Sequence, residues 1–369
     1  MKKKKKKSLA STIADTDRKE TRTKKKRLQP TLFAPMGTTL VNLALSGRWD
    51  GGAAVGGMYN APGESVSGKT LMVLTALGEV CAMPEFDKYD LVYDDVEERN
   101  NFDLEYMFGR DMAERVQPAH GYDDDGDPIK SDCIEDFQDG FMDRLDSGTP
   151  CIYILDSWDA LDCLADRKKY EEQKTAREND NDTPGSYGME KAKAASGLFR
   201  RIKSKLKKSE SLLIIVSQTR SKIGGMGGKS RSGGNAIKFY ANGEFWLAPA
   251  KKESKIFKTV NKIKSQIGIR SRCTFKKNSV SGSNREVEFE AYYDYGIDDI
   301  SANIDYLLKH KHWTGKTTID ASDFDIQASK PKLIKYIEDE ELEDDLAKIV
   351  QDVWDDYEEK LRLGRKPRF

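Results

Sequence analysis

A glycine-rich motif at residues 63–70 has the residue types and spacing of a loop that binds phosphate groups. Gly63 and the pair Gly68-Lys69 frame four residues, and Thr70 follows. Glycines let such a backbone curl so that its N–H groups point at phosphate oxygens, and the start of the next helix adds positive potential. Lys69 is expected to contact the γ-phosphate and Thr70 to offer its hydroxyl to Mg²⁺. We assign nucleotide binding to the whole loop: Gly63, Glu64, Ser65, Val66, Ser67, Gly68, Lys69 and Thr70.

Three apolar runs predict the buried strands that must position this loop's partners. The runs are 89–93, 151–155 and 212–216, and they are followed by an acidic cluster containing Glu97, by Asp156 and by Gln218. Continuous apolar runs are typical of parallel strands that are covered by helices on both faces. A short strand before residue 63 and a helix over 70–80 complete the strand–loop–helix setting of the motif.

Hydrolysis of a nucleoside triphosphate requires a carboxylate for Mg²⁺, a group that orients water and a group that contacts the γ-phosphate. We expect Asp156 to hold Mg²⁺ together with Thr70, and Glu97 to polarise the attacking water. Gln218 can hydrogen-bond the γ-phosphate while its backbone leads into the next loop, so it could transmit the nucleotide state. Three further acids stand beside Glu97 and leave that assignment open: Asp94, Asp95 and Glu98.

The remainder of the chain alternates helical, strand-like and loop segments. Residues 165–186 are highly charged and predict a mobile excursion, and the six glycines in 224–234 predict a flexible loop. Strand-like alternation over 244–247, 270–275 and 285–293 predicts an antiparallel extension. Between about 332 and 361, apolar residues recur at helical spacing and predict one acidic amphipathic helix packed on its own domain; they are Leu342, Leu346, Ile349, Val353, Tyr357 and Leu361.

Charge is unevenly distributed, although the formal net charge of the 369 residues is zero. Residues 1–27 carry thirteen Lys or Arg and three acids, whereas residues 338–359 carry twelve acids and one Lys. The basic head suits a nucleic-acid backbone, and the acidic end could compete for the same basic surface. A solvated, disordered tail is the alternative for each end.

The five cysteines and three histidines show no metal-ligand spacing, which favours a reduced intracellular chain with neither zinc nor disulfides. No apolar run approaches the roughly 20 residues that a membrane-spanning helix needs. We therefore expect a soluble protein without a membrane partner, in the cytoplasm, or in the nucleus if the lysine run acts as an address.

Taken in order, these motifs resemble the bacterial RecA recombinase family over roughly residues 37–313. The resemblance is carried by the phosphate loop, by Asp156-Ser157-Trp158-Asp159-Ala160-Leu161, and by 217–224 continuing through 233–241. It implies ATP and Mg²⁺ as cofactors, single-stranded DNA and a homologous duplex as partners, and self-association into a filament. It also implies a bacterial or phage-infected cell.

The resemblance also implies roles for individual residues. Glu97 matches the catalytic glutamate, and Gln218 matches the glutamine that couples ATP to DNA affinity. Asp103 and Tyr106 match an Asp-x-x-Tyr pair that contacts adenine, and Lys276 and Lys277 match lysines that reach the ATP of a neighbouring subunit. The family's two DNA-binding loops fall on Ser186, Tyr187 and Met189, and on Lys222, Met226, Lys229, Arg231, Gly233, Gly234 and Asn235.

The sequence thus predicts an α/β fold: a RecA-like core with a mostly parallel twisted sheet between helices, an antiparallel extension and a small C-terminal helical region. Its expected parts are a basic arm (1–30), the ATPase core with its DNA-binding loops (31–300) and a region ending in an acidic helix (301–369). The function indicated is ATP-dependent filament formation on single-stranded DNA with strand exchange. Two alternatives stay open, a ring-shaped DNA motor or loader and an ATP-switched accessory protein.

Overall fold

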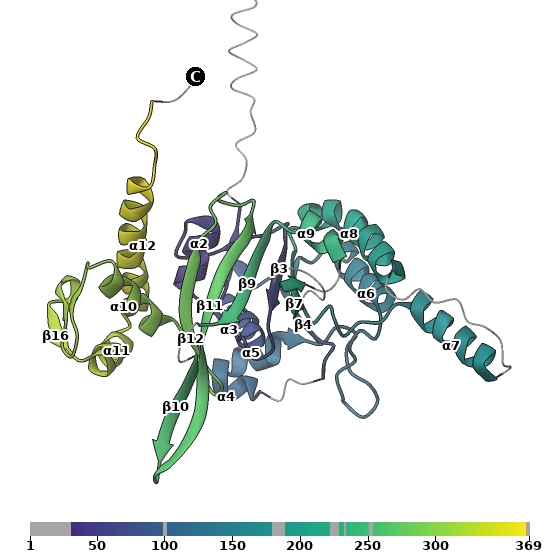
Figure 1. Ribbon diagram of the computed structural model, residues 1–369, viewed down its shortest axis with the longest axis horizontal. Coiled ribbons are helices and arrows are strands. Elements are labelled where there is room, and N and C mark those ends of the chain that lie inside the picture. Colours follow the sequence, from purple (N-terminus) through teal and green to yellow (C-terminus); the bar gives the residue numbers. More distant parts are fainter. Residues whose placement is uncertain are drawn as a thin grey trace, which may run out of the picture. The chain divides into compact units, whose positions relative to one another are not determined.

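The computed structural model describes residues 31–98, 102–178, 189–221, 229–231, 234–250 and 254–366. The chain divides into two units, Met1–Leu32 and Phe33–Phe369. Every helix and strand described below belongs to the second unit (Figure 1).

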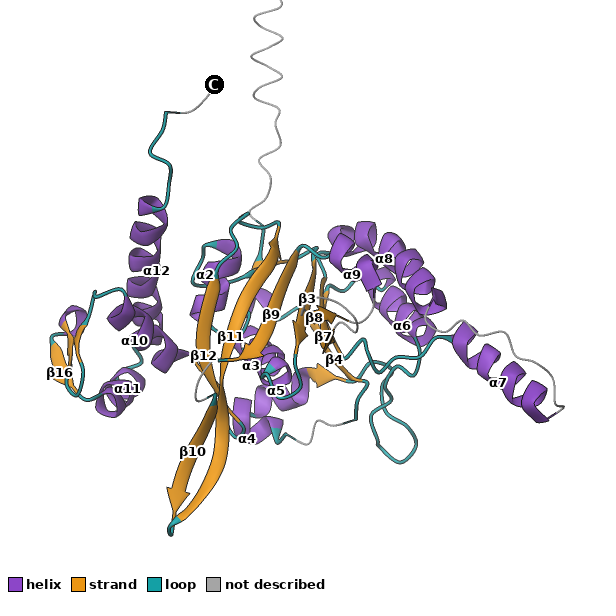
Figure 2. Ribbon diagram, in the orientation of Figure 1, coloured by secondary structure: helices purple, strands orange, loops and turns teal. Residues whose placement is uncertain are grey.

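An eleven-stranded sheet forms the centre of this unit. Six neighbouring strands run parallel in the order β9-β3-β7-β6-β4-β5 (Figure 2). Their bounds are β3 (Met58–Gly63), β4 (Asp90–Asp95), β5 (Val116–Gln117), β6 (Cys151–Asp156), β7 (Leu212–Ser221) and β9 (Gly243–Pro249). The predicted mostly parallel sheet is confirmed, and each of the three apolar runs contributes a strand to it.

Helices bury both faces of the central parallel strands, which is why β4, β6 and β7 each contain a continuous apolar run. On β6, Tyr153 and Leu155 join a core with α6 (Ile134–Asp146) and α8 (Met189–Ser209). Ile152 and Ile154 lie beside Leu77 of α3 (Lys69–Cys81), which covers the opposite face. Shorter helices complete these layers: α2 (Thr39–Ser46), α4 (Leu104–Phe108), α5 (Arg110–Arg115) and α9 (Gly234–Tyr240).

The antiparallel extension adds β11 (Ile263–Asn278), β12 (Glu286–Tyr292) and β13 (Gly296–Asp298) beside β9. A hairpin that the sequence did not predict joins β10 (Lys255–Val260) to β11, because its exposed lysines interrupt any apolar run. Within the charged excursion predicted over 165–186, the described residues form α7 (Leu164–Glu178), and the mobility of this segment stays a prediction. Two short strands, β1 (Phe33–Ala34) and β2 (Ala53–Ala54), pair with each other.

The end of the described chain carries α10 (Asp299–Lys309), α11 (Lys330–Asp339), α12 (Glu343–Lys360) and a three-stranded sheet. That sheet comprises β14 (Thr314–Gly315), β15 (Ile319–Ala321) and β16 (Ile326–Ala328). The single helix expected from residue 332 is two helices, separated by Glu341 in a left-handed conformation with φ 54°.

The buried face of α12 also differs from the predicted one. It comprises Leu346, Ala347, Val350 and Trp354, and the Trp354 ring stacks on Tyr306 of α10 with 5.9 Å between ring centres. Tyr357 and Leu361, which were assigned to the apolar stripe, are 42% and 51% exposed. Spacing alone predicted the helix, but packing against α10 selected its buried face.

Candidate functional site

The phosphate loop joins the carboxyl end of β3 to the start of α3, as the sequence predicts. Gly68 precedes the helix with φ 81°, a conformation that favours glycine. A Cβ on Gly63 would lie 2.6 Å from the Ser67 hydroxyl oxygen and 2.9 Å from the Leu247 carbonyl oxygen. Both glycines are therefore required by the fold of this loop, and the loop presents backbone N–H groups at a helix N-terminus.

Lys69 lies inside the loop and donates a hydrogen bond from Nζ to the Glu64 carbonyl oxygen at 2.6 Å. Burial lowers the pKa of Lys69, and the carboxylates of Asp156, Glu97 and Asp159 act in the opposite direction. A poorly hydrated cation attracts an anion more strongly than a solvated one does. Lys69 is thus suited to bind a phosphate group.

Thr70 and Asp156 meet at the N-terminus of α3. The Thr70 hydroxyl donates to Asp156 Oδ2 at 2.7 Å, and the Tyr93 hydroxyl donates to the same oxygen at 3.2 Å. Asp156 is only 6% exposed. Burial raises the pKa of Asp156 to about 6, which the Thr70 hydrogen bond opposes and the nearby Glu97 charge increases.

This hydroxyl–carboxylate pair fits Mg²⁺, which prefers oxygen ligands and usually takes one or two from protein while phosphates and water supply the rest. The described residues contain no cluster of three or more His, Cys, Asp or Glu that could bind a metal ion by themselves. A metal at Asp156 would therefore depend on a bound phosphate for its remaining ligands.

Glu97 connects two strand ends beside this pair. Its Oε1 accepts hydrogen bonds from the Ser157 hydroxyl and, at 2.7 Å, from Gln218 Nε2. Glu97 and Gln218 are 121 residues apart in the chain. Glu97 lies shortly after the end of β4, and Gln218 lies in β7. The structure thus brings the predicted water-orienting and γ-phosphate-contacting residues into direct contact.

The acids beside Glu97 have other partners. Asp94 is fully buried and accepts hydrogen bonds from the Ser131 backbone and hydroxyl and from Tyr153. Glu98 is exposed and forms an ion pair with Lys130 at 3.0 Å. Asp94 therefore stabilises the fold, and geometry favours Glu97 over these neighbours.

A pocket of about 200 Å³ adjoins the phosphate loop. Its lining includes residues 66–71, Phe102, Ile269 and Tyr293. Asp103 follows Phe102 and caps α4, since its carboxylate accepts a hydrogen bond from the Tyr106 backbone at 2.9 Å. The Tyr106 side chain is 74% exposed. Of the predicted adenine contacts, Asp103 thus adjoins a residue of the pocket lining, and its carboxylate is occupied as a helix cap.

The two lysines predicted to reach a neighbouring subunit lie at a bulge in β11. Lys276 Nζ is 3.3 Å from the centre of the Trp246 ring. Lys277 Nζ donates to the carbonyl oxygens of Lys238 and Phe239, at 2.8 and 3.0 Å, in the last turn of α9. Within one subunit, Lys277 therefore stabilises the C-terminus of the helix that follows the glycine-rich segment.

Several predicted DNA-binding residues lie outside the described residues: Ser186, Tyr187, Lys222, Met226 and Gly233. Two others, Lys229 and Arg231, are the first and last residues of β8 (Lys229–Arg231), which pairs with the end of β7. The segment 224–234, predicted to be a flexible loop without a stable element, thus contains a strand at 229–231 and the first residue of α9. Of the others, Gly234 and Asn235 begin α9 and Met189 begins α8.

Sequence reasoning missed three residues of this site, namely Tyr93, Ser157 and Asp159. Ser157 and Asp159 directly follow the predicted Mg²⁺ carboxylate, and this position at the carboxyl end of a parallel strand could have identified them. Tyr93 lies within an apolar run, where nothing distinguishes a tyrosine that binds a carboxylate from one that only packs.

None of the helices in the described segments combines the length and apolar character required to cross a bilayer.

The family model of the RecA N-terminal domain matches residues 175–298 of this chain. The chain is 27% identical to the Protein RecA of Clostridioides difficile over 170 residues, which are 44% of this chain and 45% of that protein.

Two further relatives are more similar over shorter segments. The Protein RecA of Geobacter metallireducens is 32% identical over 122 residues, covering 32% of this chain and 34% of the relative. That of Helicobacter hepaticus is 34% identical over 121 residues, covering 32% and 33%. The matches thus span less than half the length of each of these relatives.

Proposed function

We propose that this chain, which is similar to RecA proteins over part of its length, is a DNA-dependent ATPase that polymerises on single-stranded DNA and catalyses homologous pairing and strand exchange. The observation that carries the proposal is the contact between Glu97 and Gln218 at 2.7 Å, beside the Thr70–Asp156 pair. It joins the groups needed for hydrolysis to the strand that enters the glycine-rich segment.

In this proposal the phosphate loop binds the triphosphate of ATP through its backbone N–H groups and Lys69. Thr70 and Asp156 would hold Mg²⁺, which when bound neutralises charge on the phosphate oxygens. Glu97 orients the attacking water and accepts its proton, and the Ser157 hydroxyl holds the Glu97 carboxylate in place. Asp103 and Tyr106 border the adenine.

Gln218 is proposed to report the state of the nucleotide to DNA. Its side chain contacts Glu97, and its backbone belongs to β7, whose last residues pair with β8. When the γ-phosphate is present, the side-chain amide of Gln218 releases Glu97 and donates its hydrogen bond to the phosphate instead. The β7–β8 connection then carries this change to the DNA-binding residues.

The proposed DNA contacts are sequence-independent. Lys222, Lys229 and Arg231 would neutralise backbone phosphates, and Met226 would wedge between bases. Gly233, Gly234 and Asn235 would allow close approach of the backbone, with Ser186, Tyr187 and Met189 forming the first loop. The cytoplasm of a bacterial or phage-infected cell is the proposed setting, which the bacterial relatives support.

Self-association completes the proposed site. Lys276 and Lys277 would contribute cations to the ATP of a neighbouring subunit. Lys277 must then leave the carbonyl oxygens of α9, so assembly would also free the C-terminus of the helix after the glycine-rich segment. This exchange supports a link between filament assembly and DNA binding.

ATP hydrolysis measured with and without single-stranded DNA tests the proposal. We expect stimulation by DNA in the wild type and its loss in Lys69→Ala, because the γ-phosphate loses its buried cation. Lys316→Ala, which changes an exposed lysine remote in sequence, serves as the matched control. A rate indifferent to DNA and equal in the wild type and Lys69→Ala would overturn the proposal. Electron microscopy with a non-hydrolysable ATP analogue then separates a filament from a ring.

A further inference from the structure

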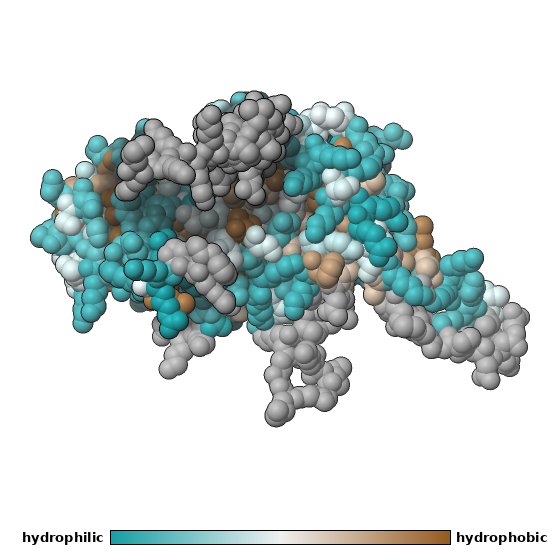
Figure 3. Space-filling view, turned by 90° about the horizontal axis from the view of Figure 1, so that it is seen from above, coloured by the Kyte–Doolittle hydropathy of each residue, from teal (hydrophilic) through white to brown (hydrophobic). Residues whose placement is uncertain are grey.

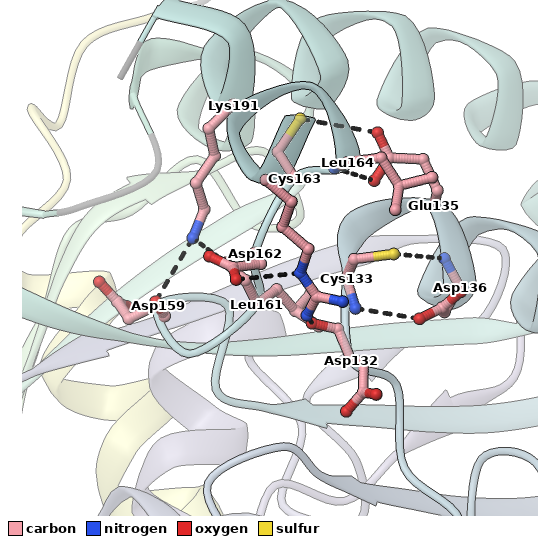
Figure 4. Close-up of polar contacts among 11 residues, drawn as sticks. Asp132, Cys133, Glu135, Asp136, Asp159, Leu161, Asp162, Cys163, Leu164 and Lys191 are labelled. Carbon is pink, nitrogen blue, oxygen red and sulfur yellow. Dashed lines mark hydrogen bonds and ion pairs between the residues drawn. The ribbon is translucent and has the colours of Figure 1, made fainter. Parts of the chain in front are cut away.

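A short turn, residues 157–161, directly follows β6 and contacts two segments that lead to the proposed DNA-binding loops. One segment is the end of β7, which precedes the glycine-rich segment. The other is the start of α8, which follows residues 179–188. Figure 4 shows Lys191 pointing toward this turn, next to Asp159 and Leu161.

Two hydrogen bonds join the turn to β7. The Asp159 carboxylate accepts one from the Gln218 backbone N–H at 2.6 Å. The Trp158 backbone N–H donates the other to the Val216 carbonyl oxygen at 2.9 Å. Gln218 is thus held at two points, by Asp159 through its backbone and by Glu97 through its side chain.

Lys191 joins the same turn to α8. Its Nζ donates to the carbonyl oxygens of Asp159, at 3.3 Å, and of Leu161, and it lies 5.9 Å from the centre of the buried Trp158 ring. Lys191 is the third residue of α8, which begins at Met189. A hydrogen bond from a charged donor is about twice as strong as a neutral one, so this contact holds the start of α8 to the turn.

We propose that Asp159 and Lys191 are positioning residues that fasten both proposed DNA-binding segments to the end of β6, so that Gln218 and the start of α8 respond to nucleotide together. This inference rests on the proposed function.

A matched pair of variants isolates the Asp159 hydrogen bond. Asp159→Asn and Asp159→Ala both remove a charge that acts on Lys69, but only the asparagine keeps an oxygen that can accept from the Gln218 N–H. Lys191→Met removes the other contact while retaining the apolar stem. Arg200→Met, at an exposed cation of α8, controls for a change of charge on that helix.

The proposal predicts that loss of the Asp159 hydrogen bond weakens coupling to DNA, whereas any effect of the lost charge on nucleotide binding is shared by the two Asp159 variants. In Asp159→Ala, we expect the DNA concentration for half-maximal ATPase stimulation to rise about tenfold, as loss of a charged hydrogen bond permits. Asp159→Asn should stay within about threefold of the wild type, and the affinity for ATP without DNA should be similar in both variants. Lys191→Met should resemble Asp159→Ala, and the double variant should lose less than the two single losses combined.

Hydrogen exchange without DNA gives a readout that does not need activity. The peptide covering 212–221 should exchange faster in Asp159→Ala than in Asp159→Asn or the wild type. Unchanged exchange, or an unchanged DNA requirement in Asp159→Ala, would overturn the inference, and so would equal behaviour of the two Asp159 variants. If the wild type itself shows no stimulation by DNA, the proposed function fails, and the exchange experiment still decides whether Asp159 positions Gln218.

Discussion

Asp156→Asn should make this protein more stable while removing the proposed Mg²⁺-dependent binding of nucleotide. Asp156 is buried, and the hydroxyls of Thr70 and Tyr93 both donate to its Oδ2. Asparagine has the same shape, and its carbonyl oxygen can accept both hydrogen bonds. The substitution therefore removes a buried charge without removing the partners of either hydroxyl.

The magnitude follows from the pKa of Asp156. Burial raises this pKa from 3.8 to about 6, so the ionised carboxylate disfavours the folded state relative to the unfolded one. The shift corresponds to about 3 kcal/mol at pH 7.5, where both states are ionised. Because the folded pKa is raised, the stability linked to Asp156 is fully present below pH 3.8 and is lost as pH rises to about 6. At pH 5 the difference should be about half as large.

Urea unfolding of the wild type and Asp156→Asn at pH 7.5 and pH 5 tests this reasoning. We expect the variant to be more stable by about 3 kcal/mol at pH 7.5 and by about 1.5 kcal/mol at pH 5. Magnesium-dependent nucleotide binding should be lost in the same variant, since a neutral amide is a poor ligand for Mg²⁺.

Asp94→Asn is the matched control with the opposite expected sign. Asp94 accepts through both oxygens, one from the Ser131 backbone and the other from the hydroxyls of Ser131 and Tyr153. An amide NH₂ group would face the Ser131 backbone N–H in one orientation, and in the other it would require the Ser131 and Tyr153 hydroxyls to accept instead of donate, so we expect a loss of about 1–3 kcal/mol. A stability gain in Asp156→Asn that is absent, or that does not shrink at pH 5, would refute the electrostatic account.

Two further predictions concern the C-terminal helices. Trp354→Ala should cost about 3–5 kcal/mol in urea unfolding because the ring is buried against α10, whereas Tyr357→Ala should cost under about 1 kcal/mol; equal losses would contradict the observed face of α12. The second prediction concerns three exposed acids of α12, which are replaced in Asp344→Asn, Asp352→Asn and Glu359→Gln. The triple variant should bind DNA more tightly at low salt, because fewer negative charges then repel the DNA phosphates. Unchanged binding across a salt titration would show that the charge of these acids is irrelevant to DNA.

The sequence alone was sufficient to predict the strand–loop–helix around residues 63–70, the parallel strands and the positions of the polar residues at their ends. These features depend on spacing along the chain: four residues between Gly63 and Gly68, and apolar runs long enough to be buried on both faces. The same local reasoning identified Asp156 and Gln218, because a polar residue after a buried strand lies at a predictable edge of a sheet.

Only the tertiary structure selected among equivalent local candidates. Glu97 was one of four neighbouring acids until Ser157 and Gln218, distant in the chain, were seen to contact it. Packing against α10 likewise selected the buried face of α12. The proposed positioning role of Asp159 follows only from the hydrogen bond that its carboxylate accepts from the Gln218 backbone. Such choices depend on contacts between segments far apart in the chain, and the physical effect that decides them, burial beside a specific partner, leaves no periodic pattern in the sequence.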